Sequence, residues 1–124
     1  MPNTVFIVED DQDIAEILRF NLEHRGYEVL WKGNGEEAYE SIKEKLPDLL
    51  ILDISLPGIS GLQICRYLRS NPKTQKLPIM ILTARTKKED REEGMRAGAD
   101  DYITKPFNLN DVMKRVDALI KLSA

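Results

Sequence analysis

Short apolar runs alternate along the chain with longer stretches in which apolar residues recur every three or four positions. Residues 5–8, 49–52 and 79–82 are unbroken apolar runs of the length typical of buried strands. Residues 27–31 and 101–104 are two more polar strand candidates. Because a continuously apolar strand must be covered on both faces, the pattern predicts a parallel sheet between two layers of helices.

Helical periodicity fills the stretches between these strands, and glycine or proline follows the last turn of most of them. The apolar positions are Ile14, Ile17, Leu18 and Leu22 in the first helix, Ala38, Ile42 and Leu46 in the second, Leu62, Cys65 and Leu68 in the third, and Val112, Val116, Leu119 and Ile120 in the fifth. The fourth helix is expected over residues 88–97. Five strand–helix units in a row predict a single doubly wound α/β sandwich over residues 1–124.

Composition narrows the class of protein. The chain has 124 residues, is 42% hydrophobic and 31% charged, and carries a formal net charge of −3, as expected for one globular domain. Lysine and arginine are mixed with acids rather than gathered, which argues against direct nucleic-acid binding. Cys65 is the only cysteine, so an intramolecular disulfide is excluded. The apolar runs are too short to cross a bilayer and no signal peptide is evident, so we expect a cytoplasmic protein without a membrane partner.

Polar residues follow several of the expected strands. Glu9 and Asp10 end the first, Asp53 the third and Thr83 the fourth, and Lys105 follows the fifth. Because the carboxyl ends of parallel strands meet at one edge, these side chains should lie together. Carboxylates suit Mg²⁺, with Asp10 and Asp53 as direct ligands and Glu9 acting through water. Asp53 could then accept a phosphoryl group, and Thr83 and Lys105 could hold its oxygens.

Taken singly, each of these residues has an ordinary structural explanation. Asp11 fits a helix N-cap better than a metal ligand, and a lone Lys105 would be a surface lysine. Trp31, at the end of an outer strand, is expected to pack locally rather than to bind a ligand. The functional hypothesis therefore depends on the convergence of several residues on one edge of the sheet.

Four segments resemble the receiver domains of bacterial two-component response regulators, and the resemblance covers essentially the whole chain. These segments are residues 8–11, VEDD; 52–58, LDISLPG; 82–85, LTAR; and 98–107, GADDYITKPF. They are most similar to the OmpR/PhoB-type subfamily, whose members usually carry a C-terminal DNA-binding domain. The resemblance implies a flavodoxin-like (βα)5 fold with a five-stranded parallel sheet in the order 2-1-3-4-5.

The resemblance also implies a role for each site residue. Asp53 would accept a phosphoryl group from a sensor histidine kinase or a small acyl phosphate. The Mg²⁺ ligands would be Glu9, Asp10, Asp53 and the backbone carbonyl of Ser55. Thr83 and Tyr102 would be the switch residues, and Lys105 would pair with the acceptor site through a cis Lys105–Pro106 bond. Ser55 and Arg85 would occupy positions that influence hydrolysis of the acyl phosphate.

In this subfamily the fourth helix, fifth strand and fifth helix form the face of a phosphorylation-dependent homodimer. The matching residues would give the intermolecular pairs Arg91–Asp111, Asp101–Arg115 and Arg96–Asp117, with Met95 and Met113 as the apolar centre. Several of the same charges also form i,i+4 pairs that would stabilise single helices instead. The expected output is transcription regulation through a DNA-binding domain outside this chain.

Other functions fit parts of this pattern. A stand-alone relay receiver would share every motif. A haloacid-dehalogenase-like phosphohydrolase would need a second acid two residues after the nucleophile, where Ser55 stands. A receiver-like scaffold that is never phosphorylated typically lacks one of the acids or the lysine, and a flavin would be repelled by the acids after the first strand. We therefore expect a signalling switch rather than a conventional enzyme, with self-phosphorylation and slow autodephosphorylation as its only chemistry.

Overall fold

A computed structural model describes residues 2–56 and 58–123, which form five strands and five helices in strict alternation. The elements are β1 (Thr4–Val8), α1 (Gln12–His24), β2 (Glu28–Lys32), α2 (Gly35–Lys45), β3 (Leu49–Leu52), α3 (Gly61–Ser70), β4 (Ile79–Thr83), α4 (Lys88–Arg96), β5 (Asp101–Thr104) and α5 (Leu109–Ser123). Among the described residues, no helix combines the length and the apolar character needed to cross a membrane.

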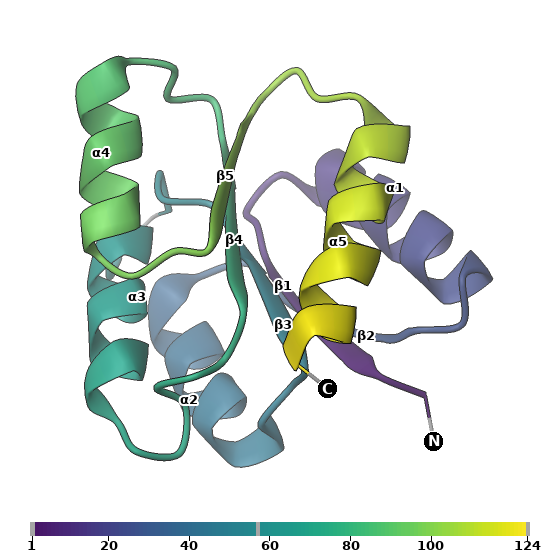
Figure 1. The fold of residues 1–124 in the computed structure, drawn as a ribbon, viewed down its shortest axis with the longest axis horizontal. Coiled ribbons are helices and arrows are strands. Elements are labelled where there is room, and N and C mark those ends of the chain that lie inside the picture. The colour runs from purple at the N-terminus through teal and green to yellow at the C-terminus, as the bar shows by residue number, and fades with distance from the viewer. Residues whose placement is uncertain (1, 57, 124) are drawn as a thin grey trace.

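All strand pairs are parallel, and the sheet order is β2-β1-β3-β4-β5. Helices α1 and α5 cover one face of the sheet, and α2, α3 and α4 cover the other (Figure 1). The flavodoxin-like order expected from the sequence is therefore confirmed. The order reverses between β1 and β3, so the carboxyl ends of these two strands flank the crevice in which such sheets bind ligands.

The core consists of two apolar clusters, one on each face of the sheet. In β1, Phe6 and Val8 join the cluster beneath α2 and α3, whereas Val5 and Ile7 join the cluster beneath α1 and α5. All four are 0–1% exposed. Side chains of a strand alternate between its faces, so a strand buried on both sides must be apolar at every position.

Two helix details differ from the sequence prediction. Helix α2 ends at Lys45, and Leu46 is not part of its buried stripe but lies 49% exposed in the left-handed region with φ 48°. Proline disfavours the α conformation in the residue before it, so Pro47 forces Leu46 out of the helix. In α1, Ile17 was expected on the buried face but is 49% exposed. The buried residues of this helix are Ala15, Leu18 and Leu22.

Arg69, near the end of α3, connects three segments at the edge of the sheet opposite the acidic strand ends. Its guanidinium donates to the backbone carbonyls of Gln75, Leu77 and Gly98 and to the carboxylate of Asp100. The Cys65 thiol of α3 donates to the carbonyl of Ala97, which caps α4. The C-terminal end of α4 is thus fastened to α3, whereas its N-cap, Lys87, makes no side-chain capping bond.

Candidate functional site

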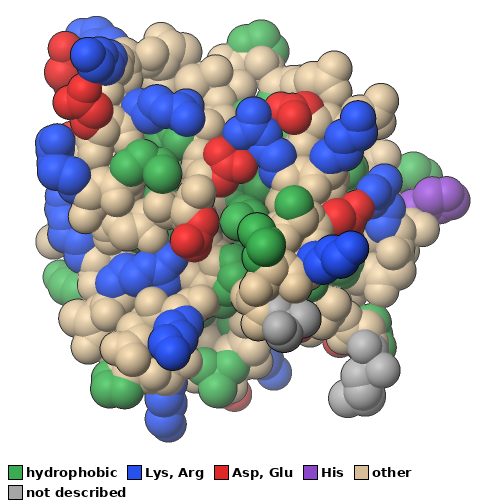
Figure 2. Space-filling view, in the orientation of Figure 1, with side chains coloured by type: hydrophobic (Ala, Val, Ile, Leu, Met, Phe, Trp, Pro, Cys, Tyr) green, Lys and Arg blue, Asp and Glu red, His purple; other side chains and the backbone are tan. Residues whose placement is uncertain are grey.

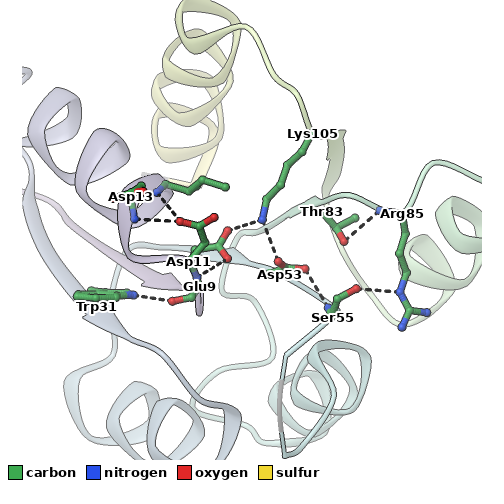
Figure 3. Close-up of polar contacts among 10 residues, drawn as sticks. Glu9, Asp11, Asp13, Trp31, Asp53, Ser55, Thr83, Arg85 and Lys105 are labelled. Atoms are coloured by element: carbon green, nitrogen blue, oxygen red, sulfur yellow. Dashed lines mark hydrogen bonds and ion pairs between the residues drawn. The ribbon is translucent and has the colours of Figure 1, made fainter.

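The polar residues that end β4 or follow β1, β3 and β5 come together at the carboxyl edge of the sheet (Figure 3). Three of them are buried: Glu9 is 2% exposed, Asp53 5% and Thr83 0%. Buried charges need partners, because an isolated ionised group loses its hydration without compensation. This need explains the ion pairs found at the site.

Lys105 supplies the positive charge. Its Nζ lies 2.6 Å from Oε1 of Glu9 and 3.0 Å from Oδ2 of Asp53. The Lys105–Pro106 peptide bond is cis, and the Lys105 backbone N–H donates to the carbonyl of Thr83 at 2.8 Å. Burial alone would lower the pKa of Lys105, but the hydrogen bonds to the two carboxylates outweigh it and raise the pKa. Burial raises the pKa of Glu9 despite the opposing bond from Lys105.

Three carboxylates at this edge could share a cation. Glu9, Asp10 and Asp53 each offer an oxygen, and these oxygens lie within 4.8 Å of one another. When ionised, the three acids exceed the single charge of Lys105 by two negative charges. A set of oxygen ligands with two negative charges in excess fits a hard divalent cation such as Mg²⁺.

The acceptor candidate Asp53 is held by backbone contacts on two sides. Its N–H donates to the carbonyl of Val8 at 3.0 Å, and its Oδ1 accepts the Ser55 N–H at 2.9 Å. On the other side, a Cβ added at Gly61 would lie 2.4 Å from the Asp53 carbonyl oxygen. Glycine at the start of α3 is therefore what allows the helix to approach the acceptor residue so closely.

Asp11 is the N-cap of α1, as the sequence predicted. Its Oδ1 accepts the N–H groups of Asp13 at 2.9 Å and Ile14 at 3.2 Å. Its own N–H donates to Oε2 of Glu9 at 3.1 Å. The capping bond satisfies backbone donors at the helix start and leaves Asp11 outside the carboxylate cluster.

Arg85 lies in the loop after β4. It connects Ser55, in the loop that follows β3 and contains Asp53 (the acceptor loop), to the buried Tyr102 of β5. Its Nε donates to Oγ of Ser55 at 2.9 Å, and its backbone N–H lies 3.4 Å from Oγ1 of Thr83 (Figure 3). The hydroxyl of Tyr102, a residue only 2% exposed, donates to the Arg85 carbonyl at 2.9 Å. Burial raises the pKa of Tyr102. The expected switch residues, Thr83 and Tyr102, therefore contact the same loop residue.

The sequence did not predict one contact of residues 9–11, the loop between β1 and α1, which we call the acid loop. The indole Nε1 of Trp31 donates to the backbone carbonyl of Glu9 at 2.7 Å. The expected local packing of Trp31 is present as well, against the cluster beneath α1 and α5. No periodicity or motif signals this bond, because it joins a side chain of β2 to a backbone group that follows β1.

A family model described as the response regulator receiver domain matches residues 5–117. The chain belongs to this family. It is 47% identical over 117 residues to the phosphate regulon transcriptional regulatory protein PhoB of Rhizobium meliloti (strain 1021), a match that covers 94% of this chain and 52% of that protein. It is 40% identical over 125 residues to the alkaline phosphatase synthesis transcriptional regulatory protein PhoP of Bacillus subtilis (strain 168), covering 99% of this chain and 50% of that protein. The receiver thus spans about half the length of these relatives.

Solved structures of receivers have the same fold. A candidate response regulator from Chloroflexus aurantiacus J-10-fl is 42% identical with a TM-score of 0.93, covering 98% of this chain and 99% of that one. The receiver domain of the sensor histidine kinase PA1611 from Pseudomonas aeruginosa PAO1 is 27% identical with a TM-score of 0.89, covering 98% and 99%. That structure has a magnesium ion coordinated in its active-site cleft. The similarity to OmpR/PhoB-type receivers is confirmed by PhoB and PhoP, and receivers are signalling proteins rather than conventional enzymes.

The face of this receiver made by α4, β5 and α5 carries mixed charges with hydrophobic side chains between them (Figure 2). Within the single chain, Arg115 pairs with Asp101 at 2.8 Å and with Asp111 at 3.2 Å. Arg91 donates to the carbonyl of Tyr102 at 3.2 Å. These charged side chains were expected to pair between two subunits, but they already form contacts within a single subunit.

Two other residues expected on this face lie elsewhere. Asp117 contacts Arg25 and the hydroxyl of Tyr27, so it fastens α5 to the connection between α1 and β2. Met113 is only 3% exposed and belongs to the core, so the prediction that it forms an apolar surface centre is wrong. Met95 is 41% exposed, and the exposed Arg96 side chain makes no hydrogen bond or ion pair with any described side chain.

Proposed function

We propose that Asp53 accepts a phosphoryl group from the phosphohistidine of a sensor histidine kinase, or from a small acyl phosphate, in a Mg²⁺-dependent step. One observation carries the proposal: the Asp53 carboxylate is nearly buried, is bound by Lys105 and the Ser55 N–H, and lies within 4.8 Å of two further carboxylates. The magnesium ion in the related Pseudomonas aeruginosa receiver supports a metal at the same edge of the fold.

The chemistry is an in-line displacement. A carboxylate oxygen of Asp53 forms a bond to phosphorus, and the bond from phosphorus to the donor atom breaks, with the electron pair leaving on the donor. Glu9, Asp10, Asp53 and the Ser55 carbonyl would hold the Mg²⁺ ion, which would neutralise charge on the phosphoryl oxygens when bound. Lys105 stays charged beside the acceptor and offsets the charge that remains on the product.

Thr83 supplies the contact that distinguishes the phosphorylated protein. Its oxygen accepts the Arg85 N–H, and no described residue accepts its hydroxyl hydrogen. That hydrogen is available to a phosphoryl oxygen on Asp53. Movement of Thr83 toward that oxygen changes the loop whose carbonyl binds the Tyr102 hydroxyl, and so transmits the signal to β5 and α4.

The output we propose is a homodimer through α4, β5 and α5. Within one chain Arg115 binds both Asp101 and Asp111, so the intermolecular pairs Arg91–Asp111 and Asp101–Arg115 would compete with these bonds. Transcription regulation through an attached DNA-binding domain is supported by PhoB and PhoP, which are transcriptional regulatory proteins about twice the length of this chain.

Incubation with acetyl phosphate and Mg²⁺, followed by intact-mass measurement, tests the proposal. We expect one added phosphoryl group, none when a chelator is added beforehand, and none in Asp53→Asn. Asp48→Asn is the matched control, because Asp48 precedes the same strand at the opposite edge of the sheet. Labelling of Asp53→Asn at the wild-type rate would contradict the assignment.

A further inference from the structure

Trp31 lies in β2, at the edge of the sheet, and is paired in register with Ile7 of β1. Its indole points to the acid loop, and the 2.7 Å bond from Nε1 ends on the backbone carbonyl of Glu9 (Figure 3). The ring is half-buried and packs on the apolar cluster beneath α1 and α5. The donor is therefore fixed in place by packing that is independent of the site.

The carbonyl bound by Trp31 belongs to the peptide group that joins Glu9 to Asp10. The Glu9 N–H donates to the carbonyl of Lys32 at 3.2 Å, so both backbone polar groups of Glu9 are bound by the β2 side of the sheet. Its carboxylate is bound by Lys105 and by the Asp11 N–H. Glu9 is thus held at every polar group.

Asp10 is held differently. Among the described residues, no hydrogen bond or ion pair reaches its carboxylate, and the residue is exposed. Its place beside Glu9 and Asp53 depends on the backbone that carries it. The peptide plane before Asp10 is the one that the indole fixes, and fixing it before a cation arrives reduces the entropy that binding must overcome.

We propose that Trp31 is a positioning residue of the metal site, whose indole N–H holds the Glu9–Asp10 peptide so that the Asp10 carboxylate stays within reach of the cation. This rests on the proposed function, in which Glu9, Asp10 and Asp53 bind Mg²⁺. An apolar residue of similar size at this position would keep the packing but could not donate the bond.

The test replaces only the donor. In a protein with β-(3-benzothienyl)alanine at position 31, sulfur takes the place of the indole N–H and the ring shape is kept. Measured by titration calorimetry, the Kd for Mg²⁺ should rise about three- to tenfold, the effect of one lost hydrogen bond next to a metal site. Trp31→Phe, which also lacks the indole N–H, should likewise raise the Kd for Mg²⁺. In the metal-free proteins, the NMR order parameter of the Asp10 amide should fall in both variants.

Tyr27→Phe is the matched control. It removes another aromatic donor next to the same strand, but at the opposite end, where the hydroxyl binds Asp117. It should leave the Kd for Mg²⁺ and the Asp10 order parameter unchanged, although it lowers stability. An equal loss of Mg²⁺ affinity in Tyr27→Phe would show a general stability effect and would overturn the proposal.

The remaining outcomes separate the two proposals. If the wild-type protein binds Mg²⁺ and the benzothienyl variant binds it as tightly, the positioning role of Trp31 is overturned and the proposed function stands. If the wild-type protein binds no Mg²⁺ at millimolar concentration, the metal assignment fails, and the role of Trp31 fails with it.

Discussion

The ammonium group of Lys105 lies 3.0 Å from Oδ2 of Asp53 and at the same time 2.6 Å from Oε1 of Glu9. One ammonium group therefore bridges Asp53, the proposed acceptor, and another acid of the carboxylate cluster. Because the side chains of Glu9 and Asp53 are 3% and 6% exposed, water compensates little of their charge. We therefore expect the stability of the fold and cation binding at these carboxylates to be linked through this lysine.

Lys105→Met should destabilise the metal-free protein by about 1–3 kcal/mol, because two buried carboxylates lose their partner. Saturating Mg²⁺ should recover part of this loss, since a bound cation replaces the missing charge. Urea unfolding with and without Mg²⁺ measures both effects. Lys88→Met removes a lysine that is 86% exposed and should change the free energy of unfolding little under either condition. The same loss for Lys105→Met with and without Mg²⁺ would argue against the link.

Thr83→Ala should separate phosphorylation from its consequence. The contacts of Asp53, the proposed acceptor, do not involve Thr83, so acetyl phosphate should still label the protein. Without the hydroxyl bond to a phosphoryl oxygen, however, dimerisation of the phosphorylated protein should weaken about tenfold or more. Sedimentation velocity on the labelled proteins measures this, and Thr83→Ser, which keeps the hydroxyl, should restore much of the dimer. Wild-type dimerisation of phosphorylated Thr83→Ala would remove Thr83 from the switch.

Gly61→Ala should slow phosphorylation of Asp53. The added Cβ would lie 2.4 Å from the Asp53 carbonyl oxygen, so either α3 or the acceptor loop must move, at a cost of about 1–3 kcal/mol. Gly33→Ala is the control near the same edge, because its Cβ would meet only the Glu9 carbonyl oxygen at an ordinary 3.8 Å. The rate of acetyl phosphate labelling compares the two, and equal rates would show that the close approach of α3 does not position the acceptor.

Asp117 gives a pH-dependent contribution to stability. Burial alone would raise the pKa of Asp117, but the hydrogen bonds from Arg25 and Tyr27 outweigh it and hold the pKa below the ordinary value near 3.8. The ionised form is therefore favoured by folding, and its contribution is present above pH 3.8 and is lost as the pH falls through the lowered value.

Asp117→Asn should accordingly lower the free energy of unfolding by about 1 kcal/mol at neutral pH, a modest value because the pair is partly exposed. The difference from wild type should shrink as the pH falls below 3.8. Urea unfolding across this range measures it. A difference that stays constant down to acid pH would show that the charge of Asp117 is not what matters.

Much of the fold followed from the sequence, because periodicity reports burial directly. β1, β3 and β4 were predicted from unbroken apolar runs, and the meeting of Glu9, Asp53 and Thr83 follows from the geometry of parallel strands. Periodicity predicts burial less well for residues at the border of the apolar stripe of a helix. Val112 and Met113 are adjacent and both buried, since the buried face of a helix is wide enough to hold two successive residues.

Contacts between side chains and distant backbone groups could not be predicted. The bonds of Arg69 to Leu77 and Gly98, and that of Trp31 to Glu9, depend on how loops from separate strand–helix units are placed. No local pattern encodes such a placement. The ion pair between the side chains of Asp117 and Arg25 could not be predicted for the same reason, because the two residues are 92 positions apart.

Trp31 is also the only tryptophan of the chain, and its indole is bonded directly to the acid loop. Indole emission responds to the hydrogen bond and polarity at Nε1, so movement of the Glu9–Asp10 peptide should change the tryptophan fluorescence of this receiver. The receiver thus contains its own optical probe at the site. Stopped-flow emission can follow cation binding and acyl phosphate formation without a dye, and can rank candidate phosphodonors by rate.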